Sequence, residues 1–224
     1  MNKAIRILST KKLQPNQRQY LLNAELSIVE ANYIETENIP FELKEIHDNL
    51  IFTSQNAVNS VLKHPEIEKL KSKNVFCVGL KTKILLSESG FQVDAYTNYA
   101  ADLAEIISLV YGTKNYTFFS GTLRKDTLPE ILTESGVVFN EINVYATTLK
   151  PQKNEVAVDG ILFFSPSAVQ SYLQQNKIKN EICFCIGETT AEALSKTTKN
   201  IVIANQPSVE NTIIQCINYY SNTL

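Results

Sequence analysis

The stretch "LIFTSQNAVNSVL" (residues 50–62) decides the fold, because the stretch "ILFFSPSAVQSYL" (residues 161–173) repeats its pattern. Ser54 and Ser165 hold the same place in the two stretches, 111 positions apart. Each stretch starts with an apolar run, reaches a hydroxyl residue and continues with a helical pattern from an Ala-Val pair. This order predicts a strand, a polar turn and a helix. We therefore expect the chain to build the same local unit twice.

The similarity continues downstream of both stretches. The segment "NVFCVGLKTKILLSESGFQVD" (residues 74–94) is matched by "EICFCIGETTAEALSKTTKNIVIA" (residues 181–204), with Gly79 and Gly187 108 positions apart. Solenoid repeats are usually about 20 to 50 residues long, so this period is too long for one. The repeat indicates a duplicated domain.

Strand-like runs alternate with helical patterns along the chain, which is typical of α/β units with parallel sheets. Two such runs lie before residue 40, five between about 45 and 145, and three after 155. If the two ends of the chain form one domain, that domain has five strands and the middle of the chain also has five. We predict a discontinuous α/β domain, 1–34 plus 150–224, and an inserted α/β domain, 38–145. The chain would cross between them near "YIETENIP" and near "VYATTLKPQ". The ten runs are 5–8, 27–33, 50–53, 75–78, 92–95, 116–119, 137–144, 161–164, 182–186 and 201–204.

The charge is nearly balanced, with 21 basic and 23 acidic residues and no block of one sign. A nucleic-acid-binding protein would show a basic stripe and a high pI, so we expect no nucleic-acid partner. The first apolar run is too short for a signal sequence, and no later run approaches the length of a membrane span. We expect a cytoplasmic, soluble monomer with no membrane partner.

The cysteines lie in apolar patterns and are predicted to be small buried hydrophobic residues. The pair Cys183 and Cys185 would be half a metal site only with a second ligand pair, and the sequence has none at ligand spacing. Neither His47 nor His64 is a good catalytic candidate, since His64 precedes Pro65 and so is expected at the end of an element. We predict no metal. The four cysteines are Cys77, Cys183, Cys185 and Cys216.

Glycine and hydroxyl residues follow most of the predicted strands. In open parallel sheets, ligands bind beyond the carboxyl ends of the strands. Several of these turns lead into helices, whose first amide groups favour anions. Serine and threonine are also the usual helix caps, and the pattern leaves both roles open. The turns contain Ser9-Thr10, Thr53-Ser54, Gly79 to Thr82, Ser120 to Thr122, Ser165 to Ser167 and Gly187 to Thr190.

Seven motifs stand in one order along the chain: "FTSQNAV", "VGLKT", "SGTLRKDTLPEIL", "VYATT", "FFSPSAV", "IGETTAEAL" and "QPSVENTI". Together they resemble the uroporphyrinogen-III synthase family across nearly the whole chain. The resemblance implies two similar parallel-sheet (flavodoxin-like) domains of α/β class, joined by a two-stranded linker. It also implies a cyclising hydro-lyase of porphyrin and heme biosynthesis that needs no cofactor.

The substrate implied by this resemblance is hydroxymethylbilane, a linear tetrapyrrole with eight carboxylates. Its terminal hydroxyl leaves as water, and the resulting azafulvene is attacked through the substituted carbon of ring D. The spiro intermediate recloses with ring D inverted, which gives uroporphyrinogen III. A chain of net charge −2 must bind such a substrate through local groups rather than through its overall field.

The resemblance also assigns residues to the site. Tyr145 in "VYATT" matches a tyrosine expected to protonate the leaving hydroxyl, although an aromatic cover for the linker is an equally open interpretation. Lys81 and Arg124 are expected as charged supplements to the turn residues. The predicted substrate-binding residues are Thr10, Ser54, Gly79, Lys81, Thr82, Gly121, Arg124, Ser165, Ser167, Gly187 and Thr190.

Two features depart from the family pattern. Glu188, inside "IGETT", would oppose carboxylates and is therefore expected to face solvent in the first turn of its helix. Lys11 and Lys12 stand where many members carry an arginine, so the charge is kept but not the bidentate geometry.

Other functional classes fit the sequence less well. A hinge-closing small-molecule-binding protein is commonly exported, and this chain shows no signal sequence. A nucleotide-dependent oxidoreductase requires G-x-G-x-x-G after the first strand, and residues 5–12 contain no glycine. A non-catalytic two-domain anion-binding protein remains the open alternative.

Overall fold

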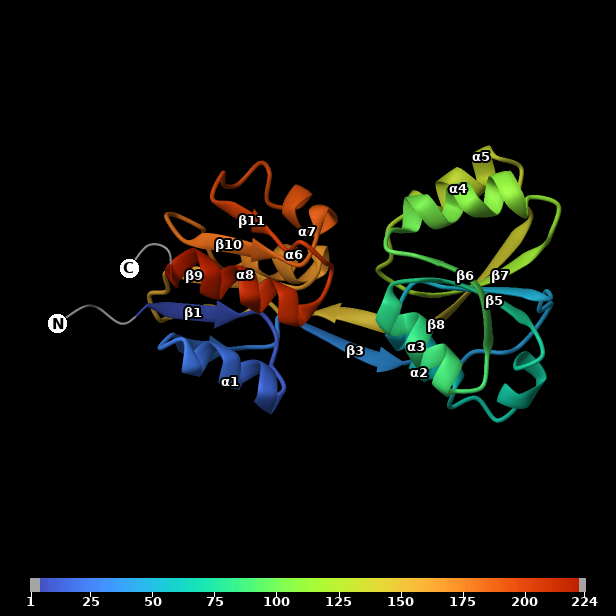
Figure 1. Cartoon of the computed structure of the whole chain (residues 1–224), viewed down its shortest axis with the longest axis horizontal. Coiled ribbons are helices and arrows are strands. Elements are labelled where there is room, and N and C mark those ends of the chain that lie inside the picture. The colour runs from blue at the N-terminus through green and yellow to red at the C-terminus, as the bar shows by residue number, and fades with distance from the viewer. Residues whose placement is uncertain (1–4, 222–224) are drawn as a thin grey trace. The chain divides into compact units, whose positions relative to one another are not determined.

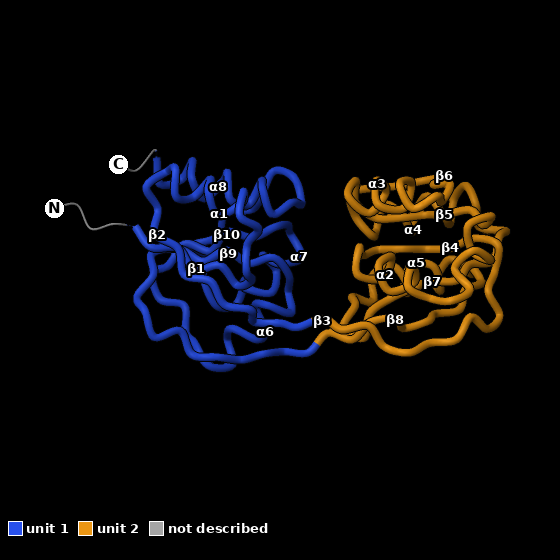
Figure 2. Tube along the Cα trace, turned by 90° about the horizontal axis from the view of Figure 1, so that it is seen from below, with its two compact units in different colours: residues 1–35, 148–224 blue, residues 36–147 orange. Residues whose placement is uncertain are grey.

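The computed structural model describes residues 5–221, which form two compact α/β units (Figure 1). Unit 1 combines the two ends of the chain, up to Glu35 and from Thr148 onward, and unit 2 spans Thr36–Thr147. Figure 2 colours the two units separately along the chain. Each unit has its own sheet and its own two hydrophobic cores.

Unit 1 contains a five-stranded parallel sheet with helices on both faces. Its strand order is β11-β10-β9-β1-β2, with β1 at Arg6–Ser9, β2 at Ser27–Glu30, β9 at Gly160–Phe163, β10 at Ile182–Cys185 and β11 at Ile201–Ile203. Strands β9 and β10 have the apolar sequences "GILF" and "ICFC". Such sequences are expected for strands that helices cover on both faces. Helices α1 (Pro15–Asn23) and α8 (Val209–Ser221) pack on one face, and α6 (Pro166–Leu173) and α7 (Glu188–Glu192) pack on the other.

Unit 2 contains a six-stranded sheet in the order β3-β8-β7-β4-β5-β6. The strands are β3 (Ile34–Asn38), β4 (Asn49–Phe52), β5 (Asn74–Val78), β6 (Gln92–Thr97), β7 (Tyr116–Gly121) and β8 (Phe139–Leu149). From β6 to β8 all neighbours are parallel. Helices α2 (Gln55–Val61) and α3 (Leu80–Glu88) cover one face, α4 (Ala100–Val110) and α5 (Thr127–Glu134) cover the other, and a short 3-10 helix, η1, spans Ile67–Leu70.

The two sheets have the same layout with different starting points in the chain. The repeated stretches form β4-α2 in unit 2 and β9-α6 in unit 1. When these are matched, the order β6-β5-β4-β7-β8 coincides with β11-β10-β9-β1-β2. When the strands of each unit are numbered by their order in the chain, the sheet of unit 1 has the order 2-1-3-4-5, as in flavodoxin. The parallel strands of unit 2 have the order 3-2-1-4-5, because the first of them, β4, is the equivalent of β9. The duplicated domain is therefore present in a circularly permuted form.

Strand β3 is absent from the ten strand-like runs predicted from local patterns, and only the family resemblance implied a second strand in the linker. Its sequence "IETEN" is mostly polar or charged and exposed, so it has no apolar alternation that would reveal a strand. It becomes a strand because it lies antiparallel to β8, with the Lys150 amide donating to Tyr33 O at 2.9 Å and the Ile39 amide donating to Val144 O at 3.3 Å. Strands β3 and β8 both pass from one unit to the other, and they form the expected two-stranded linker.

All four cysteines are buried and free, as predicted. Burial raises the pKa of the Cys77, Cys183 and Cys185 thiols to about 12, because a thiolate is poorly solvated there. Among residues 5–221, no three His, Cys, Asp or Glu side chains gather in a way that suits a metal ion. Within the same residues no helix is long and apolar enough to cross a bilayer.

Candidate active site

The strand order of each sheet indicates where a ligand would bind. In unit 2 the connections that leave β4 and β7 run to opposite faces of the sheet. Ser54 lies in the loop after β4, and Gly121 is the last residue of β7. In unit 1 the corresponding point lies between β1 and β9, whose following loops carry Thr10 and Ser165. Such a switch point, at the carboxyl ends of the strands, is the usual ligand crevice of an open α/β sheet. Four of the predicted substrate-binding residues thus lie at the two switch points.

A β-bulge places Tyr145 at the switch point of unit 2. Strand β8 pairs with β7 in regular register as far as Ser120 opposite Asn143, and then Gly121 lies opposite Tyr145. The extra residue is Val144, which is fully buried in the core beneath α2 and α3. Because the bulge skips one position, Tyr145 packs on the same face as Val144 instead of alternating away from it.

The ring of Tyr145 lies directly on the backbone of Gly121. A Cβ atom built on Gly121 would be 2.3 Å from the ring Cζ and 2.7 Å from the phenolic oxygen. Only a residue without a side chain leaves room for this arrangement. The phenol is half-buried, and its hydroxyl makes no hydrogen bond to any residue between 5 and 221. The hydroxyl is therefore held in place with its donor available to a ligand.

A pocket of about 360 Å³ opens beside Tyr145. Strand β3, helix α2 with the turn that follows it, and strand β8 form its walls. The side chain of Ser60 on the buried face of α2 donates a hydrogen bond of 2.6 Å to Asn38 Oδ1, and this bond ties α2 to β3. The pocket is lined by Thr36, Glu37, Asn38, Asn56, Asn59, Lys63 and Tyr145, all in unit 2.

Arg124 is engaged within the protein. Its Nε and Nη2 donate to the two oxygens of Glu141 at 2.6 and 2.7 Å, and Nη1 donates to Asp126. The Ser120 hydroxyl donates to the same Glu141 carboxylate at 2.5 Å. Burial alone would raise the pKa of Glu141, but the hydrogen bonds from Arg124 and Ser120 and the guanidinium charge lower it overall.

This cluster connects the turn after β7 to strand β8. The hydrogen bonds to Glu141 raise the pKa of Arg124 further, so the guanidinium stays charged. The expectation that Arg124 binds a substrate carboxylate stays a prediction, and two carboxylate partners inside the protein count against it. The observed contacts of Arg124 hold the turn after β7 against strand β8.

The two serines of the repeated stretches cap their helices. Ser54 Oγ accepts the amide of Asn56 at 3.1 Å at the start of α2, and Ser165 Oγ accepts the amide of Ala168 at 3.1 Å at the start of α6. Both keep a hydroxyl proton to donate, so capping and ligand binding are compatible. Ser167 lies in the first turn of α6 and is half-buried.

The glycine turns begin the next helix in each unit. Gly79 precedes α3 with a φ of +89°, a conformation that favours glycine, while Gly187 precedes α7 with an extended backbone. Thr82 and Thr190 each occupy the third position of the helix that follows and are buried. Burial limits the access of a ligand to these two hydroxyls, and their contact with substrate stays a prediction.

The remaining predicted residues differ in exposure. Thr10 is buried, and its hydroxyl and its amide both donate to Leu162 O, at 2.8 and 3.2 Å, while its carbonyl accepts the amide of Tyr33. Both donors of Thr10 therefore join β1 to β9, and its contact with substrate stays a prediction. Lys81 is exposed in the first turn of α3. Glu188 is exposed in the first turn of α7, as expected.

Several residues of the pocket were missed by the sequence analysis. Asn56, Asn59 and Lys63 are spaced three and four residues apart, which places them on one face of α2 and its following turn. This spacing could have indicated a shared polar face. It was overlooked because most helices of this kind have an exposed polar face that has no functional role. Glu37 and Asn38 were missed with β3 itself.

Comparisons with known proteins agree with one another. A family model described as uroporphyrinogen-III synthase HemD matches residues 18–214. The uroporphyrinogen-III synthase of Chlorobaculum parvum (strain DSM 263 / NCIMB 8327) is 26% identical in an alignment 169 residues long, which covers 66% of this chain and 69% of the relative.

Solved structures support the fold. The uroporphyrinogen-III synthetase of Helicobacter pylori 26695 is similar with a TM-score of 0.71 and 22% identity, over 96% of this chain and 99% of that one. A mutant uroporphyrinogen III synthase of the extremely thermophilic bacterium Thermus thermophilus also gives a TM-score of 0.71, with 14% identity over 99% of this chain and 100% of that one.

Proposed function

The chain belongs to the uroporphyrinogen-III synthase family, and we propose that it cyclises hydroxymethylbilane to uroporphyrinogen III with Tyr145 as the general acid. The observation that carries the role of Tyr145 is its fixed ring on Gly121, with a phenol that has no hydrogen-bond partner among residues 5–221. A proton donor must reach the departing hydroxyl within hydrogen-bond distance, and a phenol at the mouth of a polar pocket has that freedom.

The carboxylates of the substrate call for many hydrogen-bond donors. The carboxyl edge of each sheet presents backbone amides at the turns after the strands and hydroxyls at Ser54 and Ser165. Amides and hydroxyls bind carboxylates without a net positive charge on the protein, which fits the net charge of −2. We assign Ser54, Thr82, Ser165, Ser167 and Thr190 to this task, with Gly79, Gly121 and Gly187 giving close backbone approach.

Chemically, the enzyme has to assist departure of the hydroxyl and then select the carbon of ring D that attacks. The free bilane cyclises by itself to the isomer with ring D uninverted. A protein that orients the chain so that the substituted carbon attacks therefore gains more than one that supplies a strong acid. The phenol of Tyr145 is held by packing, and the other hydrogen-bond donors lie at the carboxyl edges of the two sheets. Such an arrangement suits a reaction whose outcome depends on how the substrate is oriented.

The first experiment measures the isomer ratio of the product. Freshly generated hydroxymethylbilane is incubated with the purified protein without added metal or nucleotide, and the oxidised uroporphyrins are separated into types I and III. We expect type III to predominate. Only type I, as in the protein-free sample, would refute the synthase and favour the non-catalytic anion-binding protein.

The same assay tests Tyr145. Tyr145→Phe keeps the ring on Gly121 and removes the proton, so we expect turnover to fall by about 10²- to 10⁴-fold, the usual range for loss of a general acid. Tyr20→Phe, at an exposed tyrosine on α1, is the matched control and should leave turnover unchanged. Equal turnover in the two variants would leave Tyr145 as an aromatic cover for the linker.

A further inference from the structure

The pocket beside Tyr145 contains a set of hydrogen-bond donors without partners among residues 5–221. Lys63 is exposed, and no carboxylate of that range forms an ion pair with it. Five other basic side chains of unit 2 do pair with an acidic residue: Lys44, Lys69, Lys71, Lys73 and Arg124. Lys83 lies over the ring of Tyr96.

Three asparagine side chains line the same pocket. Asn38 accepts the Ser60 hydroxyl through Oδ1, which leaves its two Nδ2 protons for another acceptor. The amide groups of Asn56 and Asn59 make no side-chain hydrogen bond with any residue of the described chain. One ammonium group and three amides thus offer donors from β3, α2 and the turn after α2.

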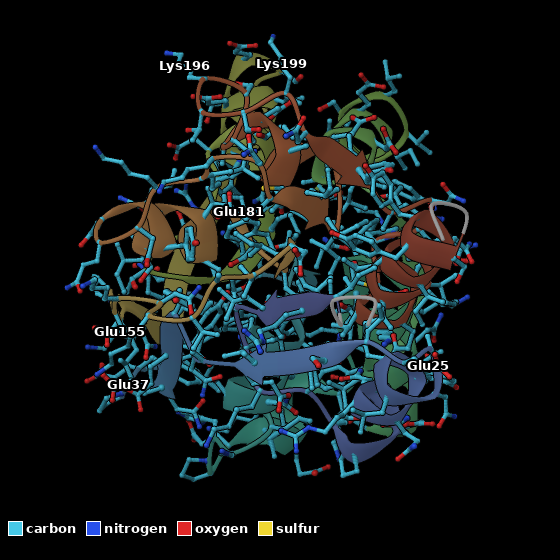
Figure 3. The ribbon with its side chains drawn as sticks, turned by 90° about the vertical axis from the view of Figure 1, so that its left-hand side faces the viewer. Glu25, Glu37, Glu155, Glu181, Lys196 and Lys199 are labelled. Carbon is cyan, nitrogen blue, oxygen red and sulfur yellow. The ribbon has the colours of Figure 1, made fainter. Side chains whose placement is uncertain are left out.

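The arrangement suits a carboxylate. A carboxylate accepts several hydrogen bonds and gains from one nearby positive charge, whereas a cation would find amide oxygens and one carboxylate beside an ammonium group. Glu37 is that carboxylate, and it is exposed on β3 (Figure 3). Its charge opposes an anionic ligand and makes the pocket a weaker site than its donors alone would make it.

We infer that Lys63, with Asn56 and Asn59, binds one carboxylate of the tetrapyrrole and so holds the substrate beside the Tyr145 hydroxyl. The inference rests on the proposed function and gives a place in the structure to one acidic side chain of the substrate. It makes Lys63 a substrate-binding residue and Glu37 a residue that limits affinity.

The kinetic test compares three charge variants of one unit. Lys63→Met should raise KM about five- to tenfold and affect kcat much less. This increase lies between the loss expected for an exposed ion pair and the loss expected for a charge-assisted hydrogen bond. Lys69→Met removes the same charge from an exposed lysine that pairs with Glu66, and KM should stay within about twofold. Glu37→Gln should lower KM, because it removes the like charge from the pocket. KM of the wild type should rise with salt more steeply than KM of Lys63→Met.

A binding measurement separates this inference from the proposed function. Uroporphyrin, the stable oxidised octacarboxylate, is titrated into the wild type, Lys63→Met and Lys69→Met, and Kd is read from its fluorescence. A Kd that weakens several-fold only in Lys63→Met supports the carboxylate subsite even if no type III product forms. Type III product together with equal KM and equal Kd in Lys63→Met and Lys69→Met would overturn the subsite and leave the synthase intact.

Discussion

Replacing Gly121 with alanine should disable the candidate active site through Tyr145. The new Cβ would lie 2.3 Å from Cζ, 2.5 Å from Cε2 and 2.7 Å from the hydroxyl oxygen of Tyr145. Carbon atoms in contact are separated by about 3.5 Å, so the ring has to move by about 1 Å. Gly121 does not have a positive φ, so the backbone itself accepts alanine and the effect acts through the ring.

The expected loss of activity follows from that displacement. A catalytic group misplaced by about 1 Å costs roughly 10²-fold in rate, which is about 2.7 kcal/mol in activation free energy. Tyr145 is only half-buried and can swing outward, so the loss of stability should stay within about 1 to 3 kcal/mol, as in other overpacked sites. We therefore expect kcat for type III product to fall about a hundredfold while the protein still unfolds cooperatively.

A double-mutant cycle decides whether Gly121 acts through Tyr145. The assay is the initial rate of type III formation for Gly121→Ala, Tyr145→Ala and the double variant, with thermal unfolding followed by circular dichroism. If the clash is the cause, Gly121→Ala should have little further effect once the ring is gone. A full hundredfold loss in the Tyr145→Ala background, or an unchanged rate for the single Gly121→Ala variant, would contradict the reasoning.

Three further predictions concern the support of the site. Ser54→Ala removes the cap of α2 and should cost about 1 kcal/mol of stability, yet retain activity within about tenfold because other donors also bind the substrate; complete loss of turnover with a normal melting curve would contradict this. Glu141→Gln should destabilise the protein by about 1 to 3 kcal/mol at neutral pH, since it weakens the hydrogen bonds from Arg124 and Ser120. The pKa of Glu141 is lowered in the folded protein, so its contribution to stability is present above the ordinary carboxyl pKa and is lost as the pH falls through the folded pKa. The free energies of unfolding of the wild type and Glu141→Gln, measured in urea, should therefore converge in acid. The four buried cysteines, with raised thiol pKa values, should not react with a thiol reagent until the protein is denatured, and rapid labelling of the native protein would show that one is accessible.

Local patterns predicted much of the fold because the two sheets are built from short apolar strands that end at hydroxyl or glycine turns. The strands at β4 and β9 were found within one or two residues, since a run covered on both faces is apolar without interruption. Strand β3 was missed because its residues are mostly polar or charged and its strand character comes from pairing with β8, a partner more than a hundred residues away. The division into 1–34 plus 150–224 and 38–145 as folding domains stays a prediction, which expression of 38–145 alone would test.

Some residues of the candidate site were predictable from the sequence, but their partners and the pocket residues on α2 and β3 were not. Tyr145, Gly121 and the turn serines carry local signals or the resemblance to a family, and these can be read from the chain. The contact of Tyr145 with Gly121 depends on a one-residue bulge, which no pattern in β8 announces. The pairing of Arg124 with Glu141 likewise required the register of β7 and β8.

By itself, the sequence determined the α/β class, the duplication and the residue types at the strand ends, because these follow from periodicity and turn chemistry within a few neighbouring residues. Only the tertiary structure decided that the two sheets share one layout through a circular permutation, that Tyr145 rests on Gly121, and that Lys63 lies in the pocket beside it. These features depend on which strands become neighbours and in what register. Such contacts join residues far apart in the chain, and no local preference of a residue specifies them.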